Sequence, residues 1–216
     1  MHTDLHPFWT DPYDDIADIS LRTEDTVEVE KENHDTTKAS YIKFIKSIIN
    51  QLIITHQLAC KMEVNFQNAV FGLDTKSIPK NVKDFNYDWL PTEESLLALE
   101  TQEDKIEDIL PKIYTQLQTM SVGLEVIFEN ENHTQFNRLK TYIRSVLCEM
   151  YIAMKDCHLQ LPPDVSRSVM PNEIRGMKGK AEIKIRNWIF FRNFIDISKC
   201  IIDVLKIFLV HITNIN

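Results

Sequence analysis

Apolar residues recur at alternating steps of three and four along four stretches of this chain. The stretches cover residues 38–65, 92–129, 134–159 and 180–212. In an α-helix this spacing places the apolar side chains on one face, so the pattern predicts four long helices. No alternating run bounded by turn residues predicts a strand. The stripe of the first stretch contains Tyr41, Ile45, Ile48, Leu52, Ala59 and Met62, with Thr55 at one polar position.

The last stretch carries two apolar stripes, and its wide apolar face predicts that it is the most buried helix. In the second stretch, Thr92 follows Pro91 as a plausible N-cap, with two glutamates in the first turn. Pro111 is expected to kink or split this helix, and Gly123 to weaken it. Glu103 interrupts its apolar stripe.

The lengths of the connections predict how the four helices are arranged. Residues 66–91 and 160–179 form long connections, whereas residues 130–133 form a short one. A short connection makes its two helices antiparallel neighbours, and a long one can return along the whole bundle. The pattern therefore predicts an all-α, up-up-down-down four-helix bundle with two long crossover loops.

The charge divides the chain into two predicted parts. The 216 residues include 32 Asp and Glu against 24 Lys and Arg, for a net charge of −8. Residues 1–37 hold eleven of the acids and two of the bases, so we expect an acidic, mostly disordered segment followed by the bundle at 38–216. The alternative is that the aromatic and acidic stretch at 9–16 docks on the bundle or on a partner. The acidic total argues against a nucleic-acid partner.

Neither a membrane segment nor a secretion signal is recognisable. The chain has no charge-free run of about 18 apolar residues, which predicts that it is not membrane-embedded. Met1 is followed by no apolar core or cleavage pattern, so a signal peptide has either been removed or does not exist.

The sequence offers little for catalysis or metal binding. It contains no Glu-x-x-His pair, no Cys-x-x-Cys pair, no nucleophile elbow and no kinase signature, so we expect a protein that is not an enzyme and has no cofactor or metal. The four cysteines are Cys60, Cys148, Cys157 and Cys200. A bond between Cys148 and Cys157 is excluded, because nine residues of helix separate them by about 13 Å. The two remaining disulfide pairings, or four free thiols, stay open.

Three segments carry a resemblance to a known family. They are NYDWLP (86–91), LPPDVSRSVMPNEIRGMKG (161–179) and EIKIRNWIFFRNFID (182–196). Together with the helix and loop lengths, they resemble the long-chain helical cytokines of the interleukin-6 class, especially the ciliary neurotrophic factor and cardiotrophin-like members. Invertebrate ligands of the Unpaired type have a similar architecture. In the interleukin-6 class a Phe-x-x-Lys motif precedes a Trp near the start of the last helix. This chain departs from that motif, with Ile183 and Arg186 before Trp188.

The resemblance implies a secreted, extracellular ligand that associates cell-surface cytokine receptors and triggers JAK/STAT-type signalling. Receptors would contact the exposed faces of the first and third helices, and the start of the last helix with the end of the first long loop. The residues implied at this second site are Ile183, Lys184, Arg186, Trp188 and Trp89. Trp188 lies on an apolar stripe, so core packing is its alternative role.

Two further features fit an extracellular protein. Asn132 begins an Asn-His-Thr glycosylation triplet in the short connection. Arg175, Lys178 and Lys180 belong to a basic cluster that is either a glycosaminoglycan contact or a solvated helix start. The alternative for the whole chain is an intracellular all-α interaction module whose acidic tail binds a basic partner.

Overall fold

The computed structural model describes residues 6–10, 12, 34–72, 82, 84–98, 106–130 and 134–214, and within these ranges the protein is all-α with no strand. Its helices are α1 (His34–Phe71), α3 (Glu93–Leu97), α4 (Ile106–Asn130), α5 (Thr134–Asp156), α6 (Asn172–Arg175) and α7 (Lys180–Asn214). A short 3₁₀ turn, η2 (Arg167–Val169), precedes α6.

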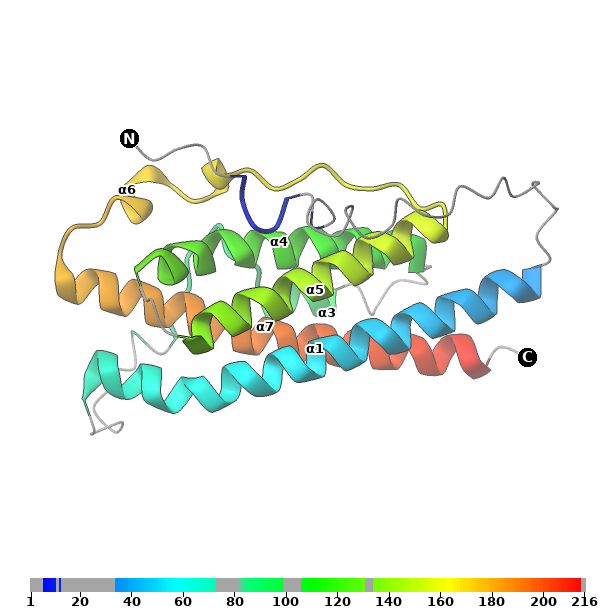
Figure 1. Ribbon diagram of the computed structural model, residues 1–216, viewed down its shortest axis with the longest axis horizontal. Coiled ribbons are helices and arrows are strands. Elements are labelled where there is room, and N and C mark those ends of the chain that lie inside the picture. The colour runs from blue at the N-terminus through cyan, green and yellow to red at the C-terminus, as the bar shows by residue number, and fades with distance from the viewer. Residues whose placement is uncertain are drawn as a thin grey trace.

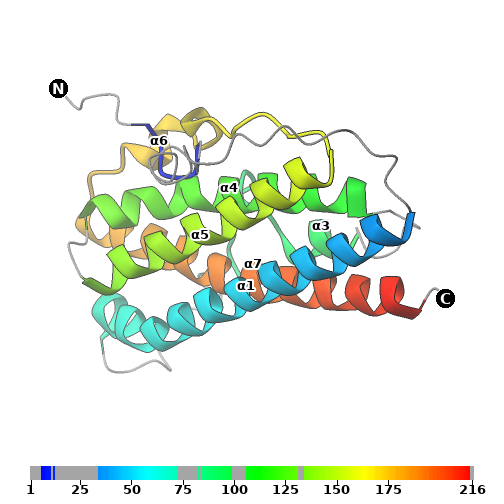
Figure 2. The same ribbon diagram turned by 45° about the vertical axis from the view of Figure 1, so that its right-hand side comes forward.

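The four long helices lie side by side along the longest axis of the molecule (Figure 1). In Figures 1 and 2, α1 and α4 both run from right to left, whereas α5 and α7 both run from left to right. Helix α1 packs against α5 and α7, and α4 packs against the same two helices. Each long helix therefore has two antiparallel neighbours.

Three of the predicted helices are confirmed with shifted ends, and the second is wrong as a single helix. Helix α1 covers residues 34–71 rather than 38–65, α5 ends at Asp156 and α7 continues to Asn214. The predicted helix 92–129 consists of two described helices, since α3 ends at Leu97 and α4 begins only at Ile106. The apolar stripe is interrupted at Glu103 in this interval, which lies outside the described residues. Pro111 lies inside α4.

The predicted N-cap is confirmed. The Thr92 hydroxyl accepts a hydrogen bond from the Ser95 amide at 3.2 Å, and the Ser95 hydroxyl accepts one from the Thr92 amide at 3.3 Å. This reciprocal pair satisfies two of the amide groups that a helix start leaves without partners. It fixes the point at which the chain leaves the aromatic segment 84–90 and enters α3.

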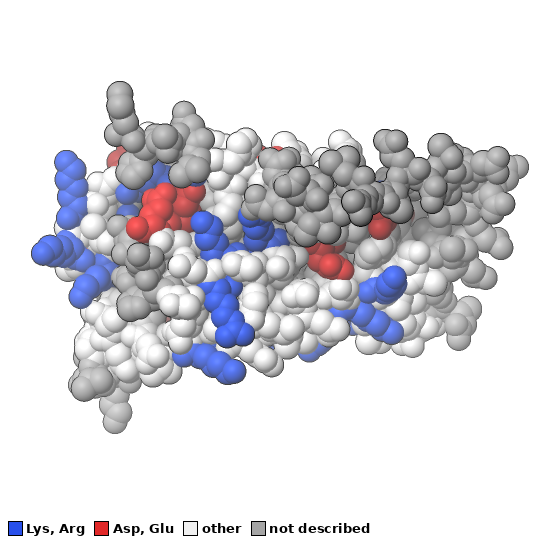
Figure 3. Space-filling model, viewed as in Figure 1, with Lys and Arg blue, Asp and Glu red and all other residues white. Residues whose placement is uncertain are grey.

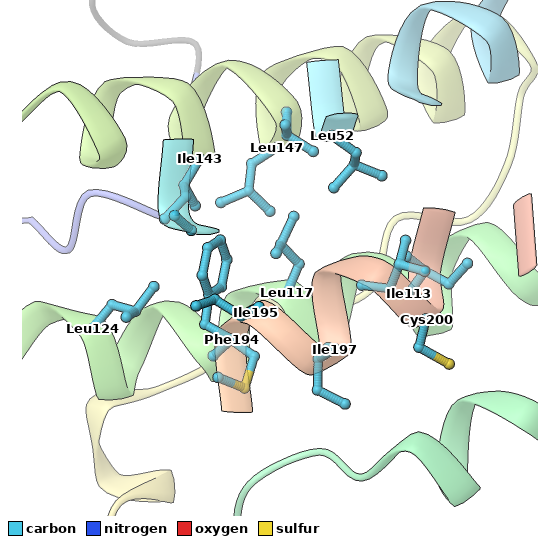
Figure 4. Close-up of a cluster of buried hydrophobic side chains, with 14 of the residues drawn as sticks. Leu52, Ile113, Leu117, Leu124, Ile143, Leu147, Phe194, Ile195, Ile197 and Cys200 are labelled. Atoms are coloured by element: carbon cyan, nitrogen blue, oxygen red, sulfur yellow. The ribbon is translucent and has the colours of Figure 1, made fainter. Parts of the chain in front are cut away.

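The core is built from the predicted stripes. Figure 4 shows aliphatic and aromatic side chains from all four long helices meeting in one cluster, among them Leu52 of α1, Leu117 of α4, Leu147 of α5 and Phe194 of α7. Each of these four side chains is at most 1% exposed. At about 25 cal/mol per Å² of buried apolar surface, such burial is the main source of the fold's stability.

The prediction that the last helix is the most buried holds only for its central part. Helix α7 is buried mainly between Arg186 and Leu205, and residues 206–214 are exposed or half-exposed. Helix α4 is buried without interruption from Met120 to Ile127. The reason is that α4 packs on α5 and α7 and is also covered by the N-terminal residues and by η2.

The N-terminal segment docks on the helices at residues 6–10, so the expectation of a disordered leader is wrong there. Trp9 is fully buried, and its indole Nε1 donates to the Val165 carbonyl at 2.9 Å. Phe8 packs on Phe128 of α4 with ring centroids 5.6 Å apart. The docking alternative for the aromatic stretch therefore holds at Trp9, while residues 13–33 lie outside the described part. Residues 34–37 belong to α1 rather than to the leader.

Two polar side chains of α4 hold the loop that leads into α7. Gln118, fully buried, donates from Nε2 to the Trp9 carbonyl at 3.0 Å and to Asp164 Oδ1 at 2.8 Å, and its Oε1 accepts from the Val165 amide at 3.0 Å. Glu125 is 7% exposed and forms ion pairs with Arg167 at 2.6 Å and Arg175 at 3.2 Å. Because a buried carboxylate requires such partners, these contacts fix the path of the loop from 164 to 175.

Candidate functional site

The start of α7 contains four of the residues implied by the resemblance, and only two of them are accessible. Ile183 is half-buried and Lys184 is exposed. Lys184 Nζ donates to the Ala69 carbonyl at 3.3 Å, which ties the start of α7 to the last turn of α1. Ile183 and Lys184 therefore remain candidates for direct contact with a partner.

Arg186 is not a surface cation, and its assignment as a direct contact residue is wrong. It is 2% exposed, and its guanidinium donates to Asn187 Oδ1 at 2.8 and 3.0 Å and to the carbonyls of Ile174 and Arg175 at 2.8 and 3.3 Å. Burial lowers the pKa of Arg186, and the guanidinium also lies 5.9 Å from the centre of the Phe190 ring. The side chain joins the end of α6 to the first turns of α7, which is a structural role.

Trp188 is also inside the protein rather than on a contact surface. It is 4% exposed and packs edge-to-face on Phe71 of α1, with ring centroids 5.2 Å apart. The guanidinium of Arg192 lies 5.0 Å from the centre of the Trp188 ring. Of the two roles considered for this residue, core packing is the one that the structure supports.

Trp89 belongs to a partly exposed group of aromatic rings, which we call the aromatic patch and define as Phe85, Tyr87, Trp89 and Phe190. Phe85 lies 5.0 Å from Tyr87, and Tyr87 and Trp89 each lie 5.4 Å from Phe190, measured between ring centroids. Phe190 is fully buried, Tyr87 and Trp89 are half-buried, and Phe85 is 45% exposed. The patch therefore passes from the core to the surface.

Gly123 of α4 lets the aromatic patch approach the helix. A Cβ atom at this position would lie 3.3 Å from Phe190 Cγ and 3.3 Å from Trp89 Cη2. The sequence suggested only that this glycine weakens the helix. In the fold the absence of a side chain makes room for two rings, which offsets the lower helix propensity of glycine.

Sequence reasoning missed Phe85 and Arg192. Arg192 donates to the Phe85 carbonyl at 2.6 Å and to the Val82 carbonyl at 3.2 Å, and so holds the segment before α3 against α7. The signal was present, since Phe85, Tyr87 and Trp89 alternate along the chain. Such alternation places three rings on one side of an extended segment, and exposed aromatic side chains are enriched at protein interfaces.

The basic cluster is only partly available to a partner. Lys178 and Lys180 are exposed, whereas the Arg175 side chain is 26% exposed and is paired with Glu125. Figure 3 shows Lys and Arg side chains gathered at the left-hand end of the molecule, where α7 begins in Figure 1. A polyanion at this end would therefore meet the lysines and not the paired arginine.

The remaining predicted features lie apart from this surface. None of the four cysteines takes part in a disulfide bond, and Asn132 lies outside the described residues. Across the described ranges, no three His, Cys, Asp or Glu side chains are close enough together to hold a metal ion. None of the described helices is both long and apolar enough to cross a membrane. The start of α7 and the aromatic patch expose aromatic, aliphatic and lysine side chains.

Comparisons with known protein families, with curated proteins and with solved structures found no match for this chain.

Proposed function

We propose that this protein is a secreted helical ligand of the cytokine type, which associates cell-surface cytokine receptor chains and triggers JAK/STAT-type signalling. The observation that carries the proposal is the direction of the long helices, with α1 and α4 parallel to each other and antiparallel to α5 and α7. The chain between α1 and α4 and that between α5 and α7 are long, while α4 and α5 are nearly continuous in sequence. These features support an up-up-down-down four-helix bundle with two crossover loops, the architecture of helical cytokines.

The first receptor contact in this proposal is the surface beside the start of α7. Ile183, Lys184 and the exposed edge of the aromatic patch at Phe85 and Trp89 would touch the receptor. Trp188 and Arg186 act from beneath this surface, by packing α7 on α1 and by joining α6 to α7. Aromatic side chains are enriched in interface cores, and tryptophan is enriched among the residues that contribute most of the binding energy.

The second contact is the outward side of α1 and α5. Ile54 and Val64 of α1 are 47% and 59% exposed, and the exposed Lys43, Lys46 and Lys61 lie on the same helix. These side chains give this side of α1 a mixed apolar and basic surface. Two separated contact surfaces are what a ligand needs in order to bring two receptor chains together.

A binding experiment with receptor ectodomains tests the proposal. The full chain is passed over a panel of immobilised cytokine-receptor ectodomains, and binding is measured by surface plasmon resonance. We expect the double variant Ile183→Asp, Lys184→Glu and the single variant Phe85→Ala to weaken binding at least tenfold. Lys206→Glu, at the far end of α7, is the matched control and should bind as the wild type does. If no ectodomain binds, the proposal fails.

A second candidate function, an intracellular all-α interaction module, is favoured by the cysteines. Four cysteines without a disulfide bond are common in a reducing compartment and uncommon in a secreted protein. Tagging the protein in its native cells and measuring how much reaches the medium separates the two candidates. Retention inside the cell supports the interaction module, and release supports the ligand. Glycosylation at Asn132 and glycosaminoglycan binding by Lys178 and Lys180 belong to the ligand proposal alone.

A further inference from the structure

A cysteine, a histidine and a serine form a chain of contacts where α1 meets α7. Cys60 Sγ lies 3.4 Å from His56 Nε2, and His56 Nδ1 lies 2.9 Å from Ser198 Oγ. The cysteine and the histidine are one turn apart on α1, and the serine comes from α7, 142 residues away from His56 in the sequence. Neither the proposed receptor contacts nor the core stripes require this arrangement.

The hydrogen bonds assign the direction of proton donation. The Ser198 hydroxyl lies 2.9 Å from the Ile195 carbonyl, which can only accept. A hydroxyl group can donate its one proton to only one acceptor. The Ser198 hydroxyl therefore donates to the Ile195 carbonyl, and Ser198 Oγ accepts a hydrogen bond from His56 Nδ1, which carries a hydrogen. His56 Nε2 then has a free lone pair, and the thiol of Cys60 is its donor.

We propose that Cys60 is a reactive thiol of this protein, with His56 as its general base, and that it forms a mixed disulfide with low-molecular-weight disulfides such as glutathione disulfide. A nucleophile within reach of a base, and a base oriented by a third side chain, is the arrangement that activates nucleophiles in proteins. Cys60 and His56 are both partly exposed, so a small disulfide reaches them from solvent. Ser198 is fully buried and holds the imidazole from the core side.

The exchange reaction balances without any further reactant. The Cys60 thiol gives its proton to His56 Nε2 while its sulfur attacks one sulfur of the disulfide. The bond between the two sulfurs of the small molecule breaks, and the departing thiolate takes the proton from the imidazolium and leaves as a thiol. Cys60 is oxidised to the mixed disulfide, and one half of the small molecule is reduced.

The charges around the pair favour a neutral thiol beside a neutral imidazole. Burial raises the pKa of Cys60, and the nearby carboxylates of Glu63 on α1 and Asp196 on α7 add to this effect. Burial lowers the pKa of His56, as does Lys199, while a hydrogen bond to the Ile195 backbone and the carboxylate of Asp203 act in the opposite direction. At pH 7 His56 is therefore unprotonated and able to accept a proton, and the thiolate forms only as the attack occurs. A thiol of high pKa gives a more nucleophilic thiolate once its proton is removed.

The test measures the reaction rate of each cysteine in the full-length native protein. The protein is mixed with glutathione disulfide, the reaction is stopped at intervals with an isotope-labelled alkylating reagent, and each cysteine is quantified by peptide mass spectrometry. We expect Cys60 to react first. Cys148 and Cys200 are 6% and 9% exposed and should react slowly. Cys157 is partly exposed and serves as the reference within the same molecule.

Variants distinguish a Cys60 reaction that is assisted by His56 from one that depends only on the exposure of the thiol. His56→Asn should lower the Cys60 rate at least tenfold at pH 7 without changing the Cys157 rate, since general-base assistance contributes factors of this size or larger. Ser198→Ala should lower it several-fold, because the imidazole loses its orienting partner. His211→Asn, at an exposed position of α7, is the control and should leave the Cys60 rate unchanged.

The pH profile gives a readout that a structural role of His56 would not produce. As the pH is raised, the Cys60 rate of the wild type should increase in a step below pH 6.5, where His56 loses its proton. This step should be absent in His56→Asn. Equal Cys60 rates and profiles in the two proteins would overturn the proposal, as would a Cys60 that reacts no faster than Cys157. If His56→Asn does not fold, as judged by circular dichroism, the wild-type profile and the Ser198→Ala rate decide the question.

Discussion

Replacing Trp9 tests the most unexpected feature of the fold, the docked N-terminal segment. The indole is fully buried, and a tryptophan buries about 200 Å² of largely apolar surface. At about 25 cal/mol per Å² this corresponds to about 5 kcal/mol, to which the bond from Nε1 to the Val165 carbonyl adds about 1 kcal/mol. These values set the upper limit for the cost of Trp9→Ala.

The expected loss is smaller, because the docked segment can detach from the helices instead of leaving a cavity. Detachment returns the conformational entropy that residues 6–10 lose when they dock, which offsets part of this cost. It also leaves Gln118 without its contact to the Trp9 carbonyl, although the contacts of Gln118 with Asp164 and Val165 remain. We therefore expect Trp9→Ala to lower the free energy of unfolding by about 2–4 kcal/mol, around the lower end of the range for large core truncations.

Urea unfolding and thermal unfolding, both followed by circular dichroism, measure this loss. For a chain of this size it corresponds to a fall in Tm of roughly 5–15 °C. Deleting residues 1–12 should cost about as much as Trp9→Ala, because both remove the same docked segment. His6→Ala changes an exposed side chain next to the segment and should stay within about 0.5 kcal/mol of the wild type. A Trp9→Ala protein as stable as the His6→Ala control would refute the docking.

Three further substitutions test other parts of the structure. Arg186→Glu should lower the free energy of unfolding by about 3–5 kcal/mol, because it buries a carboxylate among carbonyl oxygens. Lys184→Glu should change the free energy of unfolding by less than about 0.5 kcal/mol, and urea unfolding compares the two variants. Gly123→Val should destabilise the protein by about 1–3 kcal/mol and shift the tryptophan emission, since a side chain there meets Trp89 and Phe190. Burial raises the pKa of Asp196 to about 6, above its value of about 3.9 in the unfolded chain, so its ionised form is disfavoured in the fold. Asp196→Asn should therefore raise Tm slightly at pH 7.5. The difference in Tm between the variant and the wild type should shrink as the pH falls through 6 and vanish near pH 4. The effect is small because the carboxylate is half-exposed and water screens its charge. An unchanged or lower Tm at pH 7.5 would contradict the last expectation.

The helices were predictable because helical periodicity depends on residues only three and four positions apart in the sequence. The stripe through Ile45, Ile48 and Leu52 predicted a buried helical face, and all three side chains are at most 1% exposed. The cap at Thr92 was predictable for the same reason, since its partner Ser95 is three residues away. The end of α3 at Leu97 was not predicted, because the apolar stripe of the sequence continues past this point with Glu103 as its one exception.

The candidate site was less predictable, because exposure depends on residues distant in sequence. Lys184 and Arg186 are two residues apart and both cationic, yet one is exposed and the other is covered by the end of α6. The alternating aromatics from Phe85 to Trp89 were visible in the sequence, but their packing on Gly123 depends on α4 and α7 meeting at that point.

The sequence by itself determined that this protein is helical, where three of its four long helices lie, and that its acidic charge is concentrated in the N-terminal segment. Only the tertiary structure decided that Trp9 is part of the core, that Arg186 and Trp188 are buried, and that Cys60, His56 and Ser198 meet. The physical reason is the range of the interactions. Helix formation depends on neighbours three and four residues away, whereas burial and hydrogen bonding between helices depend on partners such as Val165, 156 residues from Trp9.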